Sequence, residues 1–499
     1  MAASDPQLRI ANLERELHWA QLRIQSLEER WRQHLIKFFG PKSETLSNLQ
    51  LELLEQEPSA TLDEVEAEAR SEPIAPTVQR KRKAHPGRKP LPEKLPRVEE
   101  VLACASCTCA WCGGQTTVIG YDESEVLDFE PAHYFVRVTK REKRACRHCA
   151  NAAVIAAPLA ERIVDKGLAS DAMVIGTVVA KYCDHLPLYR QAVMIEREAG
   201  VEIGRATLDG WVLRVGELLT PVIAAMRRDL LNAAYLQADE TTVPVQMHDK
   251  RGENHQAYLW QYGKPGGETV FEFCLGRGRE GPRKFLGAWE GILQTDGYQA
   301  YDDVGGPKLV QVGCWAHARR KFVDAVKVNP QDAEAVSMVT RMDALFLIDR
   351  DARQRELTAD ERLAQRAACA EEWLREIRET SLRLSRQVLP KSAMGQAVAY
   401  TLNQWPKLRR CFDYAEVELS NNLAENSMRP VALGRKNWLH VGSPQSGPKV
   451  AAILSVVESC RRLGLPVKEY LAAVLPGLNR RTLSQVANLT PARWATSRG

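Results

Sequence analysis

Three acidic residues that lie far apart in the sequence have the chemistry of ligands for a hard divalent cation. Asp239 lies within a β-rich run, Asp296 ends another, and Glu425 lies in a helical stretch. Carboxylate oxygens, together with water and a substrate phosphate, supply the near-octahedral environment that Mg²⁺ prefers. Two such ions about 3.5–4 Å apart activate an attacking oxygen and stabilise a leaving oxygen in a displacement at phosphorus. The three acids therefore predict metal-dependent chemistry on a phosphodiester.

The elements that must position these acids form a mixed α/β pattern. Short β-rich runs, the first three separated by turn residues, cover residues 235–246, 256–262, 269–275, 291–295 and 309–312. A helix at 279–289 falls between the third and fourth runs, which is typical of a mixed sheet with helices on its faces. In this order the first and fourth strands are expected to be neighbours, so Asp239 and Asp296 converge. With 63 acids in the chain, this joint placement distinguishes the three from solvated surface carboxylates.

Cysteines indicate a second, structural metal site. Of twelve cysteines, six lie between positions 104 and 149, and two Cys-x2-Cys pairs are formed by Cys109, Cys112, Cys146 and Cys149. Four thiolates arranged in this way complete a tetrahedron around Zn²⁺ and leave no position open for catalysis. Cys104 and Cys107 form a neighbouring pair, so the first knuckle has two candidate assignments, although Gly113 and Gly114 favour the later one.

The segment between the two cysteine knuckles predicts a hairpin that carries the second knuckle, as in a zinc ribbon. Its β-forming residues are Tyr134, Phe135, Val136 and Val138. The other cysteines are scattered in apolar or helical contexts and are expected to be mostly buried thiols.

A basic, proline-rich segment follows the N-terminal region. The net charge of +5 says little over 499 residues, but eight Lys or Arg face one acid between positions 80 and 97. The candidates for contact with DNA here are Arg80, Lys81, Arg82, Lys83, Arg88 and Lys89. The segment is either a solvated linker or an arm that neutralises phosphates and releases counterions, and both can hold for one segment.

The N-terminus has a heptad pattern. Apolar residues at spacings of three and four are Ile10, Leu13, Leu17, Ala20, Ile24, Leu27 and Trp31. This pattern predicts a short coiled coil, with self-association favoured over packing on the protein's own body. The helix should end near Gly40 and Pro41.

Helical periodicity begins again at Ser170, which is a plausible N-cap. A helix over 188–199, a turn at Gly200, and a third helix from Arg205 resemble a helix-turn-helix, in which the second helix enters a DNA groove. Arg205 is then a candidate for contact with DNA. Such helix pairs also serve as scaffold, and the sequence leaves both interpretations open.

The remaining periodic stretches complete the expected organisation. Charged helical residues over 330–390 predict an insertion, another helix covers 419–433, and the tail from Val450 is helical with breaks at 464–466 and 476–477. The expected segments are a coiled coil (1–40), a linker with the basic arm (41–100), a zinc-binding ribbon (101–158), a helix-turn-helix-like helical domain (159–231), the first part of the core (232–329), a helical insertion (330–395), the second part of the core (396–460) and a helical tail (461–499).

Motifs along nearly the whole chain resemble the IS66-type insertion-sequence transposases. Besides the two cysteine knuckles, they are FFGPKSE at 38–44, PGRKPLP at 86–92, KYCDHLPLYR at 181–190, ADET at 238–241, TDGY at 295–298, CWAHARRKF at 314–322 and NNLAEN at 421–426. The resemblance implies an RNase H-like catalytic core of the DDE type, with Asp239, Asp296 and Glu425 as its triad. A helical insertion fits between the second Asp and the Glu. Asn426 stands where many members have a basic residue.

The resemblance also implies an activity and partners. We expect a DDE transposase that binds the terminal inverted repeats of an insertion sequence, hydrolyses DNA at the element ends and transfers the 3′-OH ends to target DNA. Two Mg²⁺ (or Mn²⁺) ions per active site and a structural Zn²⁺ are expected. The expected partners are DNA, other copies of the chain in a homodimer or higher oligomer, and small accessory proteins encoded by the same element. A bacterial, cytoplasmic, nucleoid-associated protein without membrane contact follows from the resemblance and from the lack of apolar segments.

Residues near the last strand add candidates for the site. We expect His317 to face the catalytic pocket and orient a phosphate or water, with a hydrogen-bonded structural histidine as the alternative. Cys314 and His317 form a Cys-x2-His pair, but no second ligand pair lies nearby in the sequence. Candidate phosphate contacts are Arg319, Arg320, Lys321, Arg429, Arg435 and Lys436.

Two other function classes remain at this stage. One is a catalytically inactive, transposase-derived DNA-binding protein, which the intact set of acids argues against. The other is an RNase H-like nuclease that cuts without strand transfer, which only the family resemblance argues against.

Overall fold

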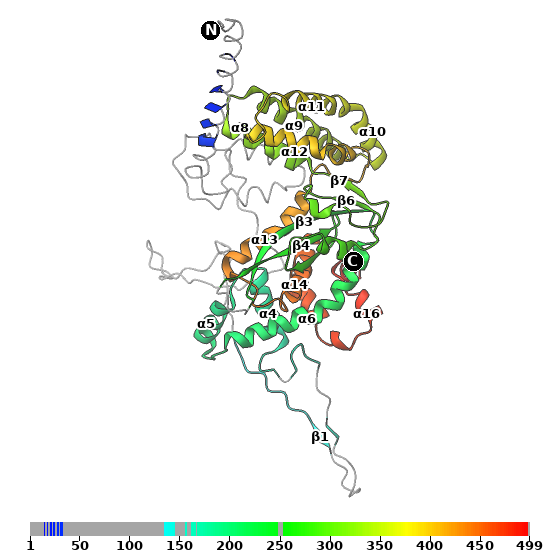
Figure 1. Cartoon of the computed structure of the whole chain (residues 1–499). Coiled ribbons are helices and arrows are strands. Elements are labelled where there is room, and N and C mark those ends of the chain that lie inside the picture. Colours follow the sequence, from blue (N-terminus) through cyan, green and yellow to red (C-terminus); the bar gives the residue numbers. More distant parts are fainter. Residues whose placement is uncertain are drawn as a thin grey trace, which may run out of the picture. The chain divides into compact units, whose positions relative to one another are not determined.

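The computed structural model describes residues 134–144, 155–156, 161–165, 167–247 and 253–497, together with helical residues between Glu14 and Arg32. The cysteine knuckles, the basic arm, Ile10 and Leu13 lie outside the described residues. The chain divides into two compact units, of which one is Pro73–Ala157 and the other comprises Met1–Glu72 and Pro158–Gly499. Many of the described elements are labelled in Figure 1, and each unit is described by itself.

The described residues between Glu14 and Arg32 are helical, as the heptad pattern predicts. Four of the seam positions, Leu17, Ile24, Leu27 and Trp31, are between 55% and 62% exposed in the single chain. Large apolar side chains that follow one helix stripe and face water are the pattern that a coiled-coil partner would bury.

The described part of the unit Pro73–Ala157 contains a two-stranded ladder. β1 (Lys143–Arg144) pairs antiparallel with β2 (Ile155–Ala156), so the strands flank the second cysteine knuckle. Residues 134–142 form no strand, so the strand expected at Tyr134–Val138 is not found. The rest of the segment between the knuckles lies outside the described residues. Phe135, Val136 and Val138 are at least 68% exposed, and the β-forming tendency of such side chains is expressed when they pack on a pleated surface.

A five-stranded mixed sheet forms the centre of the larger unit. Its strands are β3 (Tyr235–Val245), β4 (His255–Gly263), β5 (Thr269–Cys274), β6 (Ile292–Gln294) and β7 (Val310–Val312), in the order β5-β4-β3-β6-β7. β3, β4 and β5 pair antiparallel, whereas β6 lies parallel to β3 and β7 parallel to β6. The predicted mixed sheet, and the neighbouring first and fourth strands, are confirmed. α7 (Glu280–Leu286) connects β5 to β6, and η1 (Gln299–Tyr301) follows β6.

At β3 and β6, the two faces of the sheet belong to two separate hydrophobic cores. Tyr235 and Ile292 contribute to the core formed with helices of the insertion, whereas the next residues along each strand, Leu236 and Leu293, contribute to the core on the other side. This alternation follows from the two-residue period of a strand. It fixes which side chains of β3 and β6 point toward the insertion.

Helices α4 (Asp171–Tyr182), α5 (Leu188–Ala199) and α6 (Arg205–Leu230) precede the sheet. Ser170 is the N-cap of α4, as expected, and its hydroxyl accepts a hydrogen bond from the Met173 amide. Gly200 ends α5 in the left-handed conformation, with φ of 65°.

The second helix of the helix-turn-helix-like pair packs closely against a helix of the C-terminal region. α6 packs along α14 (Gly447–Arg462), and a Cβ on Gly216 would come within 2.5 Å of the Lys449 carbonyl oxygen. The close approach of the two helices therefore requires the glycine. The first turn of α6 leaves Arg205 exposed, so this end remains accessible to a partner.

α14 also covers the sheet edge formed by β5. The Ser455 hydroxyl accepts a hydrogen bond from the Phe271 amide at 2.8 Å, and Ser459 both accepts from the Thr269 amide and donates to the Thr269 carbonyl. Two serines one helical turn apart thus satisfy backbone groups that an edge strand otherwise exposes.

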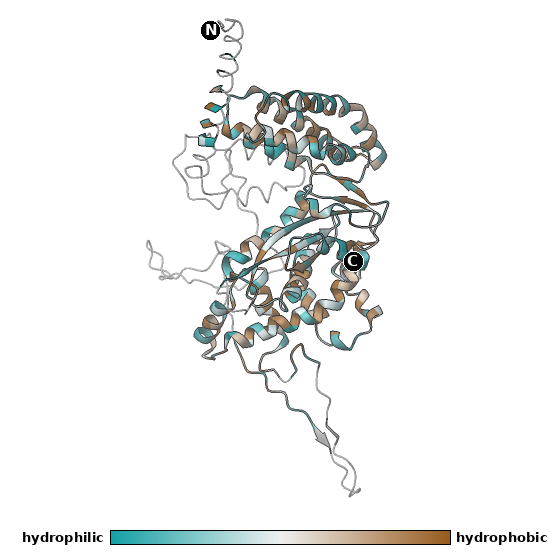
Figure 2. Ribbon diagram, viewed as in Figure 1, coloured by the Kyte–Doolittle hydropathy of each residue, from teal (hydrophilic) through white to brown (hydrophobic). Residues whose placement is uncertain are grey.

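The insertion lies between β7 and the helix that carries Glu425. It comprises α8 (Trp315–Val328), α9 (Ala333–Gln354), α10 (Ala359–Cys369), α11 (Glu371–Leu384) and α12 (Ala393–Arg410). Hydrophobic and hydrophilic residues alternate along these helices (Figure 2), as expected for helices that bury one face. On α11 the buried face includes Leu374, Ile377 and Leu384. The residues from 330 to 395 are mostly helical, as the sequence predicts, and the helical region continues through α12.

The chain returns to the sheet through α13 (Asn422–Trp438). We predict a start near Leu419, but the helix begins three residues later. The Leu419 carbonyl accepts a hydrogen bond from the Trp315 amide, and the Ser420 carbonyl accepts one from the Gln237 side chain. These long-range bonds occupy carbonyls that a longer helix would use.

The C-terminal helices follow the expected pattern. α14 is followed by α15 (Val467–Val474), η2 (Leu478–Arg480), α16 (Leu483–Ala487) and α17 (Pro491–Thr496). Gly464 and Gly477 lie at the predicted breaks with φ of 66° and 70°. Among the described residues, no helix combines the length and apolar character needed to cross a bilayer.

Candidate active site

The register between β3 and β6 places Asp239 and Asp296 together. Gln237 on β3 pairs with Gln294 on β6 in the parallel ladder. Asp239 and Asp296 each lie two residues further along, so the same alternation that directs Gln237 and Gln294 to one face directs both acids there. The two strands therefore deliver two carboxylates to neighbouring positions at the face covered by the insertion.

The turn after β6 is fixed by the insertion. The Asp296 carboxylate accepts a hydrogen bond from the Tyr298 amide at 2.8 Å, and Tyr400 on α12 donates to the Asp296 carbonyl. Gly297 has a φ of 90°, and a Cβ there would come within 2.6 Å of Gln404. Glycine is thus required both by the backbone conformation and by the close approach of α12.

Glu425 enters the site from the first turn of α13. Its amide donates to the carbonyl of the N-cap Asn421, and the Asn421 amide donates to the Cys314 thiol at 3.4 Å. Glu425 Oε1 lies 3.5 Å from His317 Nδ1, and its Oε2 lies 3.4 Å from the Arg320 guanidinium. The helix start is therefore tied to the start of α8.

The acids influence one another electrostatically. Burial raises the pKa of Asp239 well above its usual value, and the negative charges of Glu425, Glu240 and Asp296 raise this pKa further. The surroundings of Asp239 therefore destabilise its ionised form. The structure thus brings the three predicted acids within reach of one another's charge.

The donor atoms present fit divalent cations of the Mg²⁺ type. All three acids offer carboxylate oxygens, the ligand type that hard cations prefer. Glu425 Oε1 is buried and has no hydrogen-bond partner. The pKa of Asp239 is raised by burial and by the negative charges of its neighbours, which a bound cation would offset. These observations make Asp239, Asp296 and Glu425 suitable residues to hold such ions.

A second set of ligand types overlaps with Glu425. Ligand atoms of Cys314, His317 and Glu425 lie within 4.8 Å of one another, and in the part of the chain that the structure describes no other three such groups lie so close. The sequence showed the Cys-x2-His pair but not that Glu425 approaches it. Burial raises the pKa of the Cys314 thiol to about 12. The thiol is then protonated at neutral pH, which makes it a weak metal ligand.

His317 faces the site, beside Glu425. Burial lowers the pKa of His317, so the neutral imidazole predominates at neutral pH. Its Nδ1 is buried and lacks a hydrogen-bond partner. A buried, unsatisfied ring nitrogen is unlike a structural histidine, which normally pairs both nitrogens.

The predicted basic residues differ in their accessibility. Arg319 is buried, and its guanidinium pairs with Asp343. The helical period of α8 explains this, because Arg319 lies on the same face as the buried Trp315 and Phe322. Arg319 is therefore not available for contact with a phosphate, contrary to the prediction from the sequence.

The other basic candidates remain on or near the surface. Arg435 donates three hydrogen bonds to Thr241 and Thr242 of β3, which fixes α13 on the strand. Arg320, Arg205 and Lys436 are exposed, and Arg429 is half-buried on α13.

Further polar residues around the acids were not singled out by the sequence. The Glu240 side chain is 2% exposed, and its carboxylate accepts hydrogen bonds from Arg277 at 2.6 Å and Tyr301 at 2.9 Å. The Arg277 guanidinium lies 3.9 Å from the ring centre of Tyr298. Adjacency to Asp239 was the one available signal for Glu240. No local pattern pointed to Tyr400 or Arg277.

Comparisons with known proteins identify the family of the chain. Residues 166–449 match the family described as "Transposase IS66 family". An uncharacterized protein of Sinorhizobium fredii, y4jD, is 33% identical over 421 residues, which cover 81% of this chain and 81% of that protein. A second, y4hP, is 30% identical over 474 residues, covering 90% of this chain and 84% of that protein.

The N-terminal regions match related descriptions. Residues 106–150 match the "zinc-finger binding domain of transposase IS66", a range that contains all four favoured cysteines but not Cys104. Residues 26–99 match "Transposase C of IS166 homeodomain", which overlaps the end of the heptad helix and the basic arm. With matches over all three regions and a long stretch of identity to y4jD, the chain belongs to the IS66 family of transposases.

Proposed function

We propose that the chain is a DDE transposase that cleaves DNA at the ends of an insertion sequence and joins the freed ends to target DNA. The observation that carries the proposal is the convergence of three acids from distant segments. β3 supplies Asp239, the turn after β6 supplies Asp296, and α13 supplies Glu425. Their mutual charge raises the pKa of Asp239.

The strand order supports an RNase H-like assignment for the core. Three antiparallel strands are followed in the chain by two parallel ones, in the order β5-β4-β3-β6-β7. The first acid lies on the central strand, the second follows the adjacent strand, and the third lies on a helix that packs on the central strand. Side chains on neighbouring strands, and on a helix packed against them, can act together on one substrate atom.

Both proposed reactions displace an oxygen at phosphorus. Asp239, Asp296 and Glu425 would hold two Mg²⁺ or Mn²⁺ ions, which when bound activate the attacking oxygen and stabilise the leaving one. In hydrolysis, water adds to the phosphorus and the bond to the 3′-oxygen of the element breaks, leaving a 3′-OH. In joining, that hydroxyl attacks a target phosphodiester and displaces a target 3′-oxygen. His317 lies beside Glu425 and is positioned to orient a phosphate oxygen or a water.

Several basic residues are available for the DNA backbone. Arg320 and Lys436 are exposed near the start and end of helices that border the acids, and Arg205 is exposed at the start of α6. Contacts of this kind set the register of DNA on a protein without reading its sequence. The basic arm and Arg429 complete the proposed set.

We propose that zinc is structural and is held by the four favoured cysteines. The family match over residues 106–150 supports a zinc finger there. Four thiolates on one ion close its coordination sphere and stabilise a small fold that lacks a large core.

We also propose that the chain acts as a dimer or larger assembly through the heptad helix, with accessory proteins of the same element as further partners. Replacing Leu17 and Ile24 by Lys should then reduce the mass measured by light scattering to that of a single chain. The core of the larger unit should remain folded. Polar variants that retain the wild-type mass and still pair two element ends would contradict assembly through the heptad helix.

One assay separates the proposed function from its alternatives. Purified protein is incubated with labelled element ends, Mg²⁺ and a target plasmid. Strand-joined product supports the transposase, cleavage without joining supports a nuclease, and binding alone supports an inactive DNA-binding protein.

Variants assign the activity to the proposed site. Asp296→Asn should abolish the joined product while DNA binding remains. Asp303→Asn is the matched control, because this nearby acid is 82% exposed and pairs with Arg279. Equal loss in both variants, or none in Asp296→Asn, would contradict the site assignment.

A further inference from the structure

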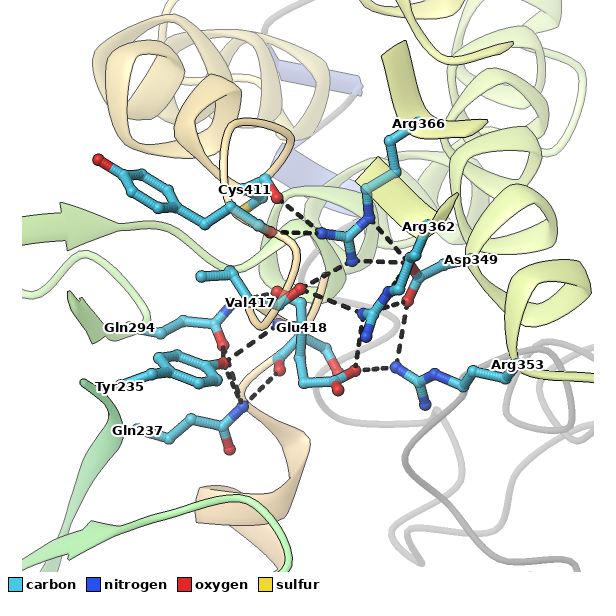
Figure 3. A network of polar contacts seen from close by, with 12 residues as sticks. Tyr235, Gln237, Gln294, Asp349, Arg353, Arg362, Arg366, Cys411, Val417 and Glu418 are labelled. Atoms are coloured by element: carbon cyan, nitrogen blue, oxygen red, sulfur yellow. Dashed lines mark hydrogen bonds and ion pairs between the residues drawn. The ribbon is translucent and has the colours of Figure 1, made fainter. Parts of the chain in front are cut away.

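A buried charge network joins the helical insertion to residues 411–420, the segment that leads into α13. Asp349 on α9 is 1% exposed and receives hydrogen bonds from three arginines, Arg353, Arg362 and Arg366. Arg353 and Arg362 also pair with Glu418. Three guanidinium groups thus face two carboxylates inside the protein (Figure 3). Such an arrangement is costly to bury unless its remaining donors are satisfied.

The remaining donors of Arg366 bind the backbone of the segment before α13. Its guanidinium donates to the carbonyls of Cys411 at 3.0 Å, Tyr414 at 2.8 Å and Val417 at 2.7 Å. The planar guanidinium offers five donors in fixed directions, which lets one side chain hold several carbonyls at once. Lysine has a single donor atom and cannot reproduce this pattern.

The same segment is held from its other side by the strands that carry the aspartates. Gln294 donates to the Glu418 carbonyl at 2.7 Å, and Gln237 donates to the Ser420 carbonyl at 2.9 Å. Tyr235 accepts a hydrogen bond from the Glu418 amide. Gln237 and Gln294 lie two residues before Asp239 and Asp296. The segment is therefore clamped between the insertion and the two strands (Figure 3).

The segment held between the insertion and the two strands ends immediately before α13, the helix that carries Glu425. Asn421 is the N-cap of α13, and Glu425 follows in the first turn. A shift of the segment at Val417 or Glu418 would therefore shift the Glu425 carboxylate relative to the two aspartates. A misplacement of about 1 Å at a reacting centre can cost on the order of 100-fold in rate.

We propose that Arg366 is a positioning residue, through which the helical insertion sets the place of Glu425 against Asp239 and Asp296. The insertion thus builds part of the catalytic centre although none of the network's residues reaches it. The inference rests on the proposed function, because it assigns Glu425 a role as a metal ligand.

Direct measurement of Mn²⁺ binding tests the proposal without relying on turnover. The free ion is followed by electron paramagnetic resonance as it is titrated into zinc-loaded, full-length protein, and Glu425→Gln defines the component due to the active site. We expect Arg366→Lys to weaken that component about 10-fold or more, the range known for residues that orient metal ligands. The rate of end cleavage at fixed Mn²⁺ should fall in parallel, and binding of element ends should be unchanged.

Arg341→Met is the matched control. Arg341 pairs with Glu376 at 2.8 Å and joins α9 to α11 in the same insertion, but it makes no bond to the segment before α13 among its described contacts. Its loss should lower the melting temperature and leave Mn²⁺ affinity at the wild-type value. If Arg366→Lys does not fold, Arg362→Lys decides, because Arg362 also binds Asp349 and the Val417 carbonyl.

The outcomes are separable. Wild-type Mn²⁺ affinity in a folded Arg366→Lys protein, or in Arg362→Lys where it must decide, overturns the positioning role. So does an equal loss in Arg341→Met. If Glu425→Gln itself binds Mn²⁺ like the wild type, the proposed metal site fails instead, and the positioning role fails with it.

Discussion

Asp239→Asn is expected to abolish cleavage and joining while making the protein more stable in the absence of Mg²⁺. Loss of a group that directly stabilises the transition state costs on the order of 1,000-fold, so we expect at least that reduction in the rate of end cleavage. The stabilisation arises because asparagine removes a charge that burial disfavours and that Glu425, Glu240 and Asp296 repel. A residue kept for its chemistry at the expense of stability behaves in this way.

The sign of the pH dependence follows from the raised pKa of Asp239. Below the pKa that Asp239 has in the unfolded chain, the carboxyl group is neutral in both the folded and the unfolded state. The folded protein is then not destabilised by the charge of Asp239. As pH rises toward the higher pKa of the folded protein, the unfolded state loses its proton first, and folding stability falls. The asparagine variant does not share this fall. Its advantage over the wild type should therefore grow as pH rises above about 4.

Thermal unfolding of both proteins from pH 4 to 8, without added Mg²⁺, checks this prediction. We expect the melting temperature of the variant to exceed that of the wild type by at least about 2 °C at pH 7. Added Mg²⁺ should stabilise the wild type more than the variant, since an ion that binds only the folded state raises its stability. A variant that is less stable at every pH would show that Asp239 has a structural role instead.

Asp349→Asn is expected to be the most destabilising single change of a polar residue in the insertion. Removing one partner of a buried ion pair leaves the other charge uncompensated and costs about 3–5 kcal/mol. Here three arginines surround the carboxylate, and asparagine would place amide hydrogens toward one of them. We expect a loss of this size in the free energy of unfolding, measured by chemical denaturation.

The charge on Asp349 also predicts acid sensitivity. Burial alone would raise the pKa of Asp349, but the charges of Arg366, Arg362 and Arg353 outweigh burial and hold the pKa below its usual value. The stability from this carboxylate is therefore present above the pKa of the unfolded chain, and it is lost as pH falls through the lower pKa of the folded protein. The difference between Asp349→Asn and the wild type should shrink below about pH 4.

Asp351→Asn is the control for this prediction. Asp351 lies two residues after Asp349 on α9, and its side chain is 51% exposed. It pairs with Arg355 at the surface, where ion pairs contribute little. We expect this variant to unfold at the wild-type denaturant concentration. Equal effects of the two substitutions would mean that the buried network does not stabilise the insertion.

The sheet and the pairing of the two aspartates were predictable because their signals are local. β-branched and aromatic runs separated by turns gave strands close to the observed bounds. The order of those runs placed the strands of Asp239 and Asp296 side by side. The approach of Glu425 depends on α13 packing against β3, which no short-range pattern in the sequence encodes.

Features that depend on long-range contacts could not be predicted in this way. The start of α13 is set by the Trp315 amide and the Gln237 side chain, which are remote in the sequence. Arg362 and Arg366 occur in a charged helix that is typical of a solvated surface, yet Arg366 is 1% exposed. For Arg319 a signal existed, because its spacing from Trp315 and Phe322 places it on the buried face of α8.

The most direct test of the catalytic centre is a crystal structure of the protein with an element end and Mn²⁺, in which anomalous scattering locates the metal. We expect two manganese peaks about 3.5–4 Å apart, with carboxylate oxygens of Asp239, Asp296 and Glu425 as their protein ligands. A single peak held by Cys314, His317 and Glu425, or peaks with no contact to Asp239, would contradict the two-metal centre.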